Sequence, residues 1–541
     1  MPRDLEKILH DVEFISKSSV NYDHSKSFSS LIVIGKNSLS QKNISENISK
    51  TDDPKIKELW ESLNSEDNIL KRLTLCENIR FLDSQNIDVP RMIMHCYLDL
   101  EQVTAAKEIL DEFESKHGDI YQVIFAKADY LRHIGKFDDS IPLYKEALLQ
   151  SPDNDQILNN IGIAYSGLHD FDNAIVYYKK QLEINENDDI ALFNLGLTLY
   201  KKRLYRDAKN QFEKIISLFP NEHDSWWGKG LCHYQLQQYD EAIKYFDNAI
   251  ELNPKFSEVH HDKGKTFYQL QKYDQAILCY DKAIKLDKKS ASAHNNKGLA
   301  LSMLKQFDQA ILCYDKAIQI DEQFDAAYLN KGISFIEINK PQEAIKCYDK
   351  AIELDPKSIK GYWNKGILLK DMKQYDAAMF YIDKVIELDS KFTWGYLCKG
   401  DLLLKIKLYN EAIKCFEKLI ELNPNDANMF NDIAWNYCKN KQFEKAKPFI
   451  ENSLLIDASQ SFIWHTLGYI HMNLGNDDKA LHVFNHALSL NQNQPDSLRD
   501  KGKILFKMGL IEEARELIKK SKELEPEDEE LNEFIKNTKI I

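Results

Sequence analysis

The sequence predicts an all-α protein, a solenoid of helical hairpins stacked one on the next. Its 541 residues are too many for one compact core of ordinary size. A small residue recurs every 34 positions, and the letters AILCYDKAI at 276–284 return unchanged at 310–318. Such a period indicates a repeated structural unit, because a single hairpin cannot bury its apolar face without a neighbour.

The recurring small residue marks twelve units between residues 121 and 528, without insertion or deletion. The anchors are Ala128, Gly162, Gly196, Gly230, Gly264, Gly298, Gly332, Gly366, Gly400, Ala434, Gly468 and Gly502. Twelve residues after each anchor comes a second small residue, such as Ala276, and four residues later a large one, usually aromatic, such as Tyr280. We expect the small residues to let two antiparallel helices approach, with the ring filling the space beside them.

Each unit contains two helices joined by a short bend, and many units end in proline, which cannot continue a helix. After the bend, the apolar residues of 276–284 follow helical spacing. An aspartate often follows the aromatic residue at the start of the second helix, where we expect it to be the N-cap. These aspartates are Asp172, Asp240, Asp274, Asp308 and Asp376.

This pattern resembles the tetratricopeptide repeat, a helix–turn–helix of 34 residues with preferred residue types at fixed places. The resemblance covers residues 121–528 and implies a right-handed superhelical solenoid whose inner groove is lined by the first helices. Its departures from the family pattern are local. Ala434 replaces the anchor glycine, Pro341 and Asp477 replace the aromatic before the second helix, and His260 and His294 take the tryptophan or tyrosine place of the first helix.

The two ends of the chain depart from the repeat. Residues 1–54 are rich in serine, asparagine and lysine, and we expect them to be poorly ordered. Residues 55–120 are expected to form a divergent helical region with one degenerate repeat. Residues 529–541 have the composition of an acidic capping helix, the polar end that a repeat array requires.

The composition indicates a folded, cytoplasmic protein. With a formal net charge of −14, the chain lacks the excess of lysine and arginine that nucleic-acid binding requires. No stretch is apolar for long enough to span a membrane, and the start lacks the layout of a secretion signal. These features argue against nucleic-acid and membrane partners.

The cysteines and histidines do not predict a metal or cofactor site. The nine cysteines are scattered, and four of them share one repeat position, so we interpret them as packing residues in a reducing compartment. These four are Cys279, Cys313, Cys347 and Cys415. His260, His261 and His294 lack ligand spacing on one helix face and are interpreted as packing residues.

Function is therefore expected on a surface. In the family the second, fifth, ninth, twelfth and thirteenth places of the first helix face the groove, and aromatic residues there would be anchors for a partner. The alternative is that neighbouring units bury these rings. The candidate partner-binding residues are Phe193, Trp227, Tyr234, Tyr268, Asn330, Lys360, Trp363, Asn364, Trp394, Leu397, Trp435 and Tyr469.

Two patterns of lysine residues could indicate ligand binding, but simpler explanations are favoured. Asn330, Lys360 and Asn364 lie in the window that best fits the family's carboxylate clamp, but that window matches it only in part, so we reject the clamp. A lysine ladder occupies the seventh place of six units, where we expect the stems to pack and the ammonium groups to reach water. Its members are Lys229, Lys263, Lys297, Lys331, Lys365 and Lys399.

The sequence thus predicts a non-catalytic scaffold or adaptor that binds a protein or peptide segment in the groove of the superhelix. No catalytic set of residues stands out, and the repeats use most of the chain. The alternative is an accessory or regulatory subunit of an enzyme complex, with activity linked to the N-terminal 120 residues.

Overall fold

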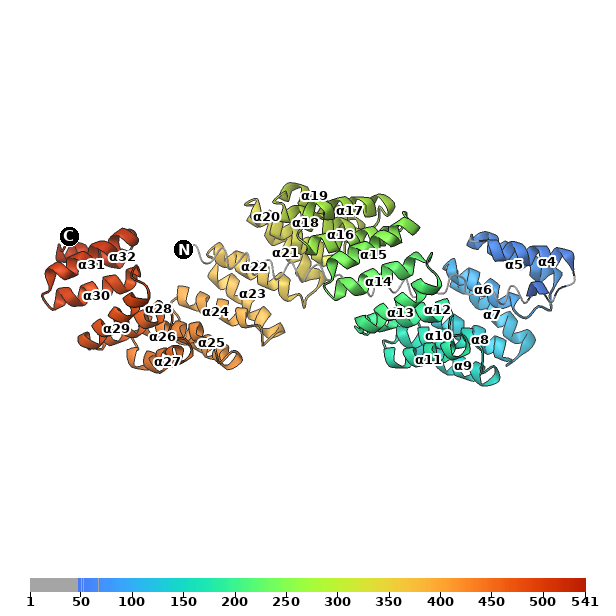
Figure 1. Cartoon of the computed structure of the whole chain (residues 1–541), viewed down its shortest axis with the longest axis horizontal. Coiled ribbons are helices and arrows are strands. Elements are labelled where there is room, and N and C mark those ends of the chain that lie inside the picture. Colours follow the sequence, from blue (N-terminus) through green and yellow to red (C-terminus); the bar gives the residue numbers. More distant parts are fainter. Residues whose placement is uncertain (1–46, 50, 52, 67) are drawn as a thin grey trace. The chain divides into compact units, whose positions relative to one another are not determined.

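The structure, a computed structural model, describes residues 47–49, 51, 53–66 and 68–541 (Figure 1). The chain divides into two compact units, residues 1–322 (unit 1) and 323–541 (unit 2), which are considered separately. All regular elements longer than one turn in the described parts are α-helices. The prediction of poor order for residues 1–54 lies mostly outside the described residues.

In the described part of unit 1, two helix pairs precede the regular repeat: α4 (Pro54–Ser65), α5 (Ile69–Leu82), α6 (Val89–Asp99) and α7 (Val103–His117). Six pairs of regular length follow. They are α8 (Tyr121–His133), α9 (Phe137–Gln150), α10 (Asp155–Gly167), α11 (Phe171–Ile184), α12 (Asp189–Lys201), α13 (Tyr205–Leu218), α14 (His223–Gln235), α15 (Tyr239–Leu252), α16 (Ser257–Gln269), α17 (Tyr273–Leu286), α18 (Ala291–Met303) and α19 (Phe307–Ile320).

Unit 2 holds six more pairs and a final helix. They are α20 (Asp325–Glu337), α21 (Pro341–Leu354), α22 (Ile359–Asp371), α23 (Tyr375–Leu388), α24 (Thr393–Lys405), α25 (Tyr409–Leu422), α26 (Ala427–Lys439), α27 (Phe443–Ile456), α28 (Ser461–Asn473), α29 (Asp477–Leu490), α30 (Pro495–Lys507), α31 (Ile511–Leu524) and α32 (Glu529–Thr538).

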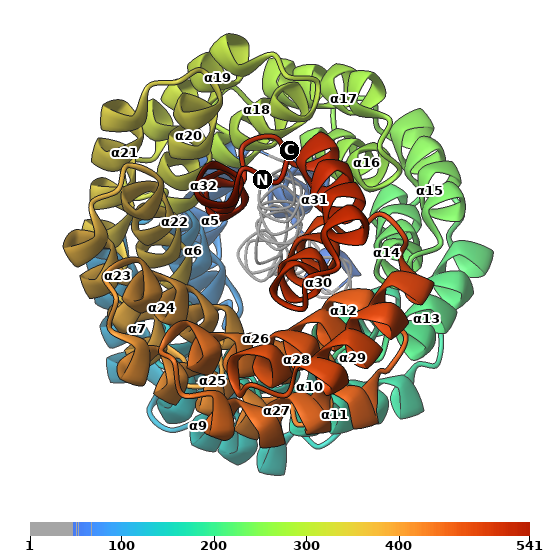
Figure 2. The same ribbon diagram turned by 90° about the vertical axis from the view of Figure 1, so that its left-hand side faces the viewer.

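Within each unit, each helix packs on the next one in sequence. The first helices of the hairpins form one layer and the second helices form the other. In unit 1, for example, the first helices α14, α16 and α18 lie inside the second helices α15, α17 and α19 (Figure 2). The fold is therefore the predicted solenoid of stacked hairpins, and its first helices share one face in each unit.

The anchor glycines explain how closely the two helices of a hairpin approach. A Cβ atom added at Gly298 would lie 2.5 Å from Cε1 of Tyr314, the ring sixteen residues later, and one at Gly468 would lie 2.5 Å from Cε1 of Phe484. Both rings are fully buried. The predicted pairing of a small residue with a large ring is thus the central contact of the hairpin.

The bend between the two helices holds one residue in the left-handed backbone region. In most hairpins this residue is not glycine, which costs roughly 1 kcal/mol. The residues are His169, Arg203, Gln237, Gln271, Lys305, Asn339, Lys373, Lys407 and Lys441, with glycine only at Gly135, Gly475 and Gly509 of the repeat hairpins.

The predicted caps of the second helices were wrong. Helix α17 begins at Tyr273, so its N-cap is Lys272 and Asp274 lies inside the first turn. There the carboxylate complements the helix dipole without capping an amide. Side-chain caps occur on several first helices, where Asp188 accepts from the amide of Ala191 and Ser290 from that of Ala293, and on the second helix α11, where Asp170 accepts from the amide of Asn173.

Among the residues that the structure describes, no helix combines the length and apolarity needed to cross a membrane.

Candidate functional site

The predicted partner-binding residues all lie on first helices, but they divide between the two units. Phe193, Trp227, Tyr234 and Tyr268 lie on α12, α14 and α16 of unit 1. The other eight lie in unit 2, on α20 (Asn330), α22 (Lys360, Trp363, Asn364), α24 (Trp394, Leu397), α26 (Trp435) and α28 (Tyr469).

In unit 1 the candidate rings are packed between helices. Trp227 is 1% exposed, and its Nε1 donates to Oδ2 of Asp262 over 2.9 Å. Tyr234 and Tyr268 are also buried, and Phe193 is half-buried with its ring centroid 5.8 Å from that of Phe212. These rings are therefore not freely exposed. Trp227 bonds to the next first helix, whereas Tyr234 and Tyr268 pack against Tyr239 and Tyr273 of their own hairpins.

In unit 2 exposure varies along the row. Trp363 is buried edge-on against Phe392, with ring centroids 5.2 Å apart. Trp394 is 36% exposed, which makes it the most accessible of the candidate tryptophans. Trp435 is half-buried, with its ring centroid 5.0 Å from that of Tyr469. The ring of Trp394 on α24 is thus partly exposed on the surface.

Polar groups flank these rings. The side-chain Nδ2 of Asn364 on α22 and Oδ1 of Asn431 on α26 are buried without a hydrogen-bond partner among the described residues. Lys360 is half-buried; burial lowers its pKa, and the carboxylate of Asp325 on α20 partly offsets this effect. Sequence reasoning missed Asn431, although it occupies the same fifth place as Trp363.

Asn330, by contrast, is buried on α20, and Leu397 packs partly buried against the apolar cluster around α24 and α25. The residues that remain accessible or incompletely bonded therefore centre on α22, α24 and α26. The role of all twelve residues in binding stays a prediction.

The lysine ladder is not simply solvated, contrary to expectation. Each paired lysine contacts a carboxylate sixteen residues earlier, on the second helix of the preceding hairpin: Lys229–Glu213 (3.1 Å), Lys263–Asp247 (2.5 Å), Lys297–Asp281 (2.6 Å), Lys365–Asp349 and Lys399–Asp383 (2.7 Å). Burial opposes the charge of Lys365, but the bond to Asp349 outweighs it and raises the lysine pKa. These lysines join successive hairpins.

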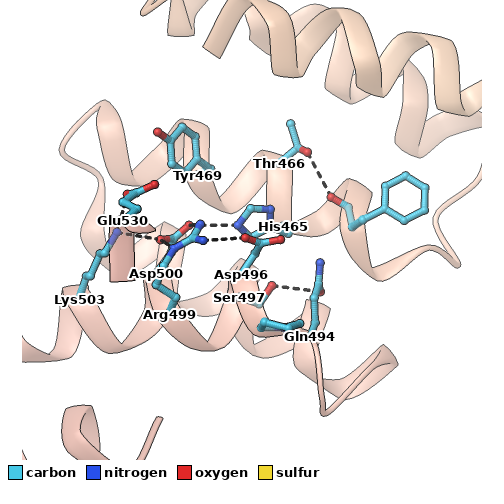
Figure 3. A network of polar contacts seen from close by, with 12 residues as sticks. His465, Thr466, Tyr469, Gln494, Asp496, Ser497, Arg499, Asp500, Lys503 and Glu530 are labelled. Carbon is cyan, nitrogen blue, oxygen red and sulfur yellow. Dashed lines mark hydrogen bonds and ion pairs between the residues drawn. The ribbon is translucent and has the colours of Figure 1, made fainter. Parts of the chain in front are cut away.

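A buried carboxylate organises the first helices at the C-terminal end of unit 2 (Figure 3). Asp500 on α30 is fully buried and lies 3.1 Å from Nε2 of His465 on α28, while Nε of Arg499 donates to it over 2.8 Å. Burial disfavours the charge, but these two groups outweigh burial and hold the pKa of Asp500 below its usual range.

The same network fixes the final helix. Nη1 of Arg499 donates to Asp528, the N-cap of α32, over 2.8 Å, and Lys503 pairs with Glu530 of α32 at 2.5 Å. Two ion pairs thus attach α32 to the last hairpin.

Unit 1 has an equivalent centre on α8. Asp129 is fully buried and accepts from Tyr144, Asn160 and Arg91 at 2.7, 2.8 and 2.8 Å, and Nε2 of His95 lies 2.9 Å away. Arg91 and His95 outweigh the effect of burial and hold the pKa of Asp129 below its usual range. The Asp129 carboxylate is fully bonded inside the packing, and only Nδ1 of His95 lacks a partner among the described residues, so we interpret this cluster as structural.

The cysteines and histidines also pack. All nine thiols are free. Burial raises the pKa of Cys398 and Cys438 to about 12, which keeps both thiols protonated near neutral pH. His260 is buried, with Nε2 lying 3.3 Å from the carbonyl oxygen of Pro254. In the described parts no cluster of three potential metal ligands occurs.

Comparison with protein families matches most of the repeat region. Models described as tetratricopeptide repeat match residues 155–188, 193–255, 291–324, 326–358, 359–392, 394–426, 461–494 and 498–528, and one described as TPR repeat matches 264–305. A search of curated protein sequences found no match to the chain.

Solved structures with similar folds include three that show the range of likeness. The APC/C hetero-tetramer Cut9–Hcn1 is 14% identical, with 91% of this chain and 98% of that chain covered and a TM-score of 0.45. MamA is 26% identical over 30% and 95% of the two chains, with a TM-score of 0.28. YrrB, described as a TPR protein with an unusual peptide-binding site, is 20% identical over 34% and 95%, with a TM-score of 0.29.

Proposed function

Because the chain belongs to the tetratricopeptide repeat family, we propose that it is a non-catalytic scaffold for protein interaction. The partner is a segment of another protein, bound along the first helices α22, α24 and α26 of unit 2. The repeats supply this row because hairpins of one length place equivalent residues side by side.

The observation that carries the proposal is the combination of an accessible indole with incompletely bonded amides on neighbouring first helices. Trp394 is exposed on α24, and Asn364 and Asn431 lie on the helices before and after it. A buried amide atom without a partner is costly, so a bound main chain that reaches these two atoms after a small shift of their side chains would be stabilising there. Tryptophan is a common anchor of protein interfaces.

The candidate rings of unit 1 are less accessible than Trp394. Trp227, Tyr234 and Tyr268 are buried, and Phe193 is half-buried. A partner could reach the buried rings only by separating helices, whereas Trp394 needs no such rearrangement.

The test places a photoreactive phenylalanine analogue at position 394 of the full chain, with a matched chain carrying it at Phe380. Phe380 lies on the second helix α23 and is also exposed. We expect irradiation in native lysate to join a discrete protein to position 394 but not to position 380. Trp394→Ala should then weaken recovery of that protein by about tenfold, the size of a modest anchor residue.

The proposal is wrong if position 380 captures the same proteins as position 394, or if Trp394→Ala binds the identified protein as tightly as the parent chain. Helical circular dichroism of the variant serves as the control for folding.

A further inference from the structure

The bends of three successive hairpins in unit 2 carry an unusual density of lysine. Residues 370–374, 404–408 and 438–442 contain six lysines and one aspartate, although the whole chain has a net charge of −14. The lysines are Lys370, Lys373, Lys405, Lys407, Lys439 and Lys441. Since α22–α23, α24–α25 and α26–α27 are consecutive hairpins, these bends follow one another along one edge of the unit, here called the lysine edge.

These lysines are not part of the ion pairs that join the hairpins. On α22, Lys365 pairs with Asp349, and on α24, Lys399 pairs with Asp383. Further along the same two helices, Lys370 and Lys405 form no ion pair with the described residues, and neither do the other four lysines of the edge. The protein therefore pairs lysines with carboxylates where hairpins meet, whereas the six lysines of the lysine edge form no ion pair with the described residues.

The fold does not require lysine at these positions. In unit 1 the corresponding residues 234–238, 268–272 and 302–306 hold six glutamines and two lysines, and they form the same bends. Lys373, Lys407 and Lys441 have φ of 61°, 64° and 55°, a conformation that glycine adopts at the same place in later hairpins of unit 2. Lysine stands there despite the backbone preference.

Nearby carboxylates have a structural explanation. Asp376, Glu411 and Glu444 lie in the first turns of α23, α25 and α27, where they complement the positive ends of the helix dipoles. Apolar groups accompany the lysines: Leu408 is 44% exposed, and Ile406 is 36% exposed. The edge therefore offers cations interspersed with apolar side chains.

We propose that the lysine edge binds an acidic protein segment that also carries apolar residues. Its carboxylates pair with the ammonium groups, and its apolar side chains cover Ile406 and Leu408. A short segment fits this charge pattern better than a long polyanion, because screening confines attraction to about 10 Å and the rest of this acidic chain repels a nucleic acid or an anionic membrane. This surface adjoins the first-helix row, since Nζ of Lys439 lies 4.8 Å from the ring centroid of Trp435, but its test changes neither of these residues nor Trp394, so either site can fail without the other.

The test compares two variants of the full chain with equal change in charge. The edge variant carries Lys373→Gln, Lys405→Gln, Lys407→Gln and Lys441→Gln, which introduces the residue type that unit 1 uses. The control variant carries Lys346→Gln, Lys357→Gln, Lys391→Gln and Lys414→Gln, all at exposed lysines of unit 2 away from these bends. A second edge variant carries Lys373→Gly, Lys407→Gly and Lys441→Gly. Glycine readily adopts the left-handed backbone conformation of these three positions, so this variant is expected to keep the fold.

The probe is a short fluorescent peptide of alternating glutamate and leucine, measured by anisotropy at about 0.15 M salt, near physiological ionic strength. We expect both edge variants to bind it more weakly, by roughly tenfold for the four lysines lost in the glutamine variant and roughly fivefold for the three lost in the glycine variant, and the control variant to change less than about twofold. The proposal is overturned if the parent chain does not bind the peptide, if a glutamine–leucine peptide binds equally well, or if the control variant loses as much affinity.

Two further probes separate the classes of partner. A single-stranded oligonucleotide of equal charge and vesicles containing an anionic lipid are titrated with the same proteins. Binding of either that exceeds peptide binding and disappears in the edge variants would replace the acidic segment by a nucleic acid or a membrane surface.

Discussion

In unit 1 the bends after α14, α16 and α18 are rich in glutamine, whereas in unit 2 the bends after α22, α24 and α26 are rich in lysine. The packing of the two units is nevertheless the same. In unit 1 a Cβ atom added at Gly298 would lie 2.5 Å from Cε1 of Tyr314, and in unit 2 one added at Gly468 would lie 2.5 Å from Cε1 of Phe484. A few paired positions therefore determine the packing of the hairpin, and this packing does not fix the residue types in the bends.

The largest expected effect tests whether packing is really shared. Gly298→Leu in unit 1 and Gly468→Leu in unit 2 should each cost at least about 3 kcal/mol, because the new side chain meets a buried ring that cannot move away. Thermal unfolding followed by circular dichroism, with hydrogen exchange to locate the loss, measures both.

Gln275→Leu is the control for that experiment, since it adds a leucine at an exposed position of α17 and should change stability by less than about 0.5 kcal/mol. A loss in one unit without the other would show that the two units do not share one packing scheme.

The buried carboxylates provide the next test. Asp129→Asn in unit 1 and Asp500→Asn in unit 2 should each destabilise by about 3 kcal/mol, because the partly buried Arg91 and the buried Arg499 lose their charged partner. Asp376→Asn, in the exposed first turn of α23, should cost less than about 1 kcal/mol. Urea unfolding compares the three, and equal midpoints for Asp500→Asn and Asp376→Asn would contradict the role given to Asp500.

The effect of pH on the free energy of unfolding is expected to be smaller for each residue involved. Burial lowers the pKa of His133 and His261, both in unit 1, to about 4, whereas an unfolded histidine has a pKa of about 6.5. Between these values the unfolded chain binds more protons, so the free energy of unfolding of unit 1 decreases as pH falls. From pH 7 to 5 we expect a loss of about 2 kcal/mol for each histidine.

Hydrogen exchange measures this difference locally. Lowering the pH should increase opening around α16 more than around α30, after correction for intrinsic exchange rates, and His261→Gln should reduce the increase at α16. An unchanged pH dependence in His261→Gln would show that this histidine is not the group responsible.

The sequence was sufficient for the hairpins but not for the candidate site. Period and residue size identify the contact of Gly298 with Tyr314, because both residues recur at fixed spacing. Accessibility has no such signature. Trp227 and Trp394 were both expected on the groove face, yet Asp262 on the next first helix helps to bury Trp227, while Trp394 remains exposed.

Polar partners were also missed for physical reasons. Asp129 is held by Arg91, 38 residues earlier, and no local pattern announces a bond between helices so far apart in sequence. The ladder pairs are different, because Lys297 and Asp281 recur at a constant spacing that could have been recognised. The cap prediction failed because the helix starts two residues earlier than an N-cap at Asp274 requires, at Tyr273 and not at Gln275.

The constant spacing of the ladder has a consequence for how this chain can evolve. A lysine such as Lys263 or Lys297 finds its acid on the hairpin before it, at the same place each time. Gain or loss of one 34-residue block by recombination would therefore join surfaces that already match in charge and shape. The number of repeats can therefore change without creating a mismatched interface between hairpins. A newly added repeat would be stable before it has any function.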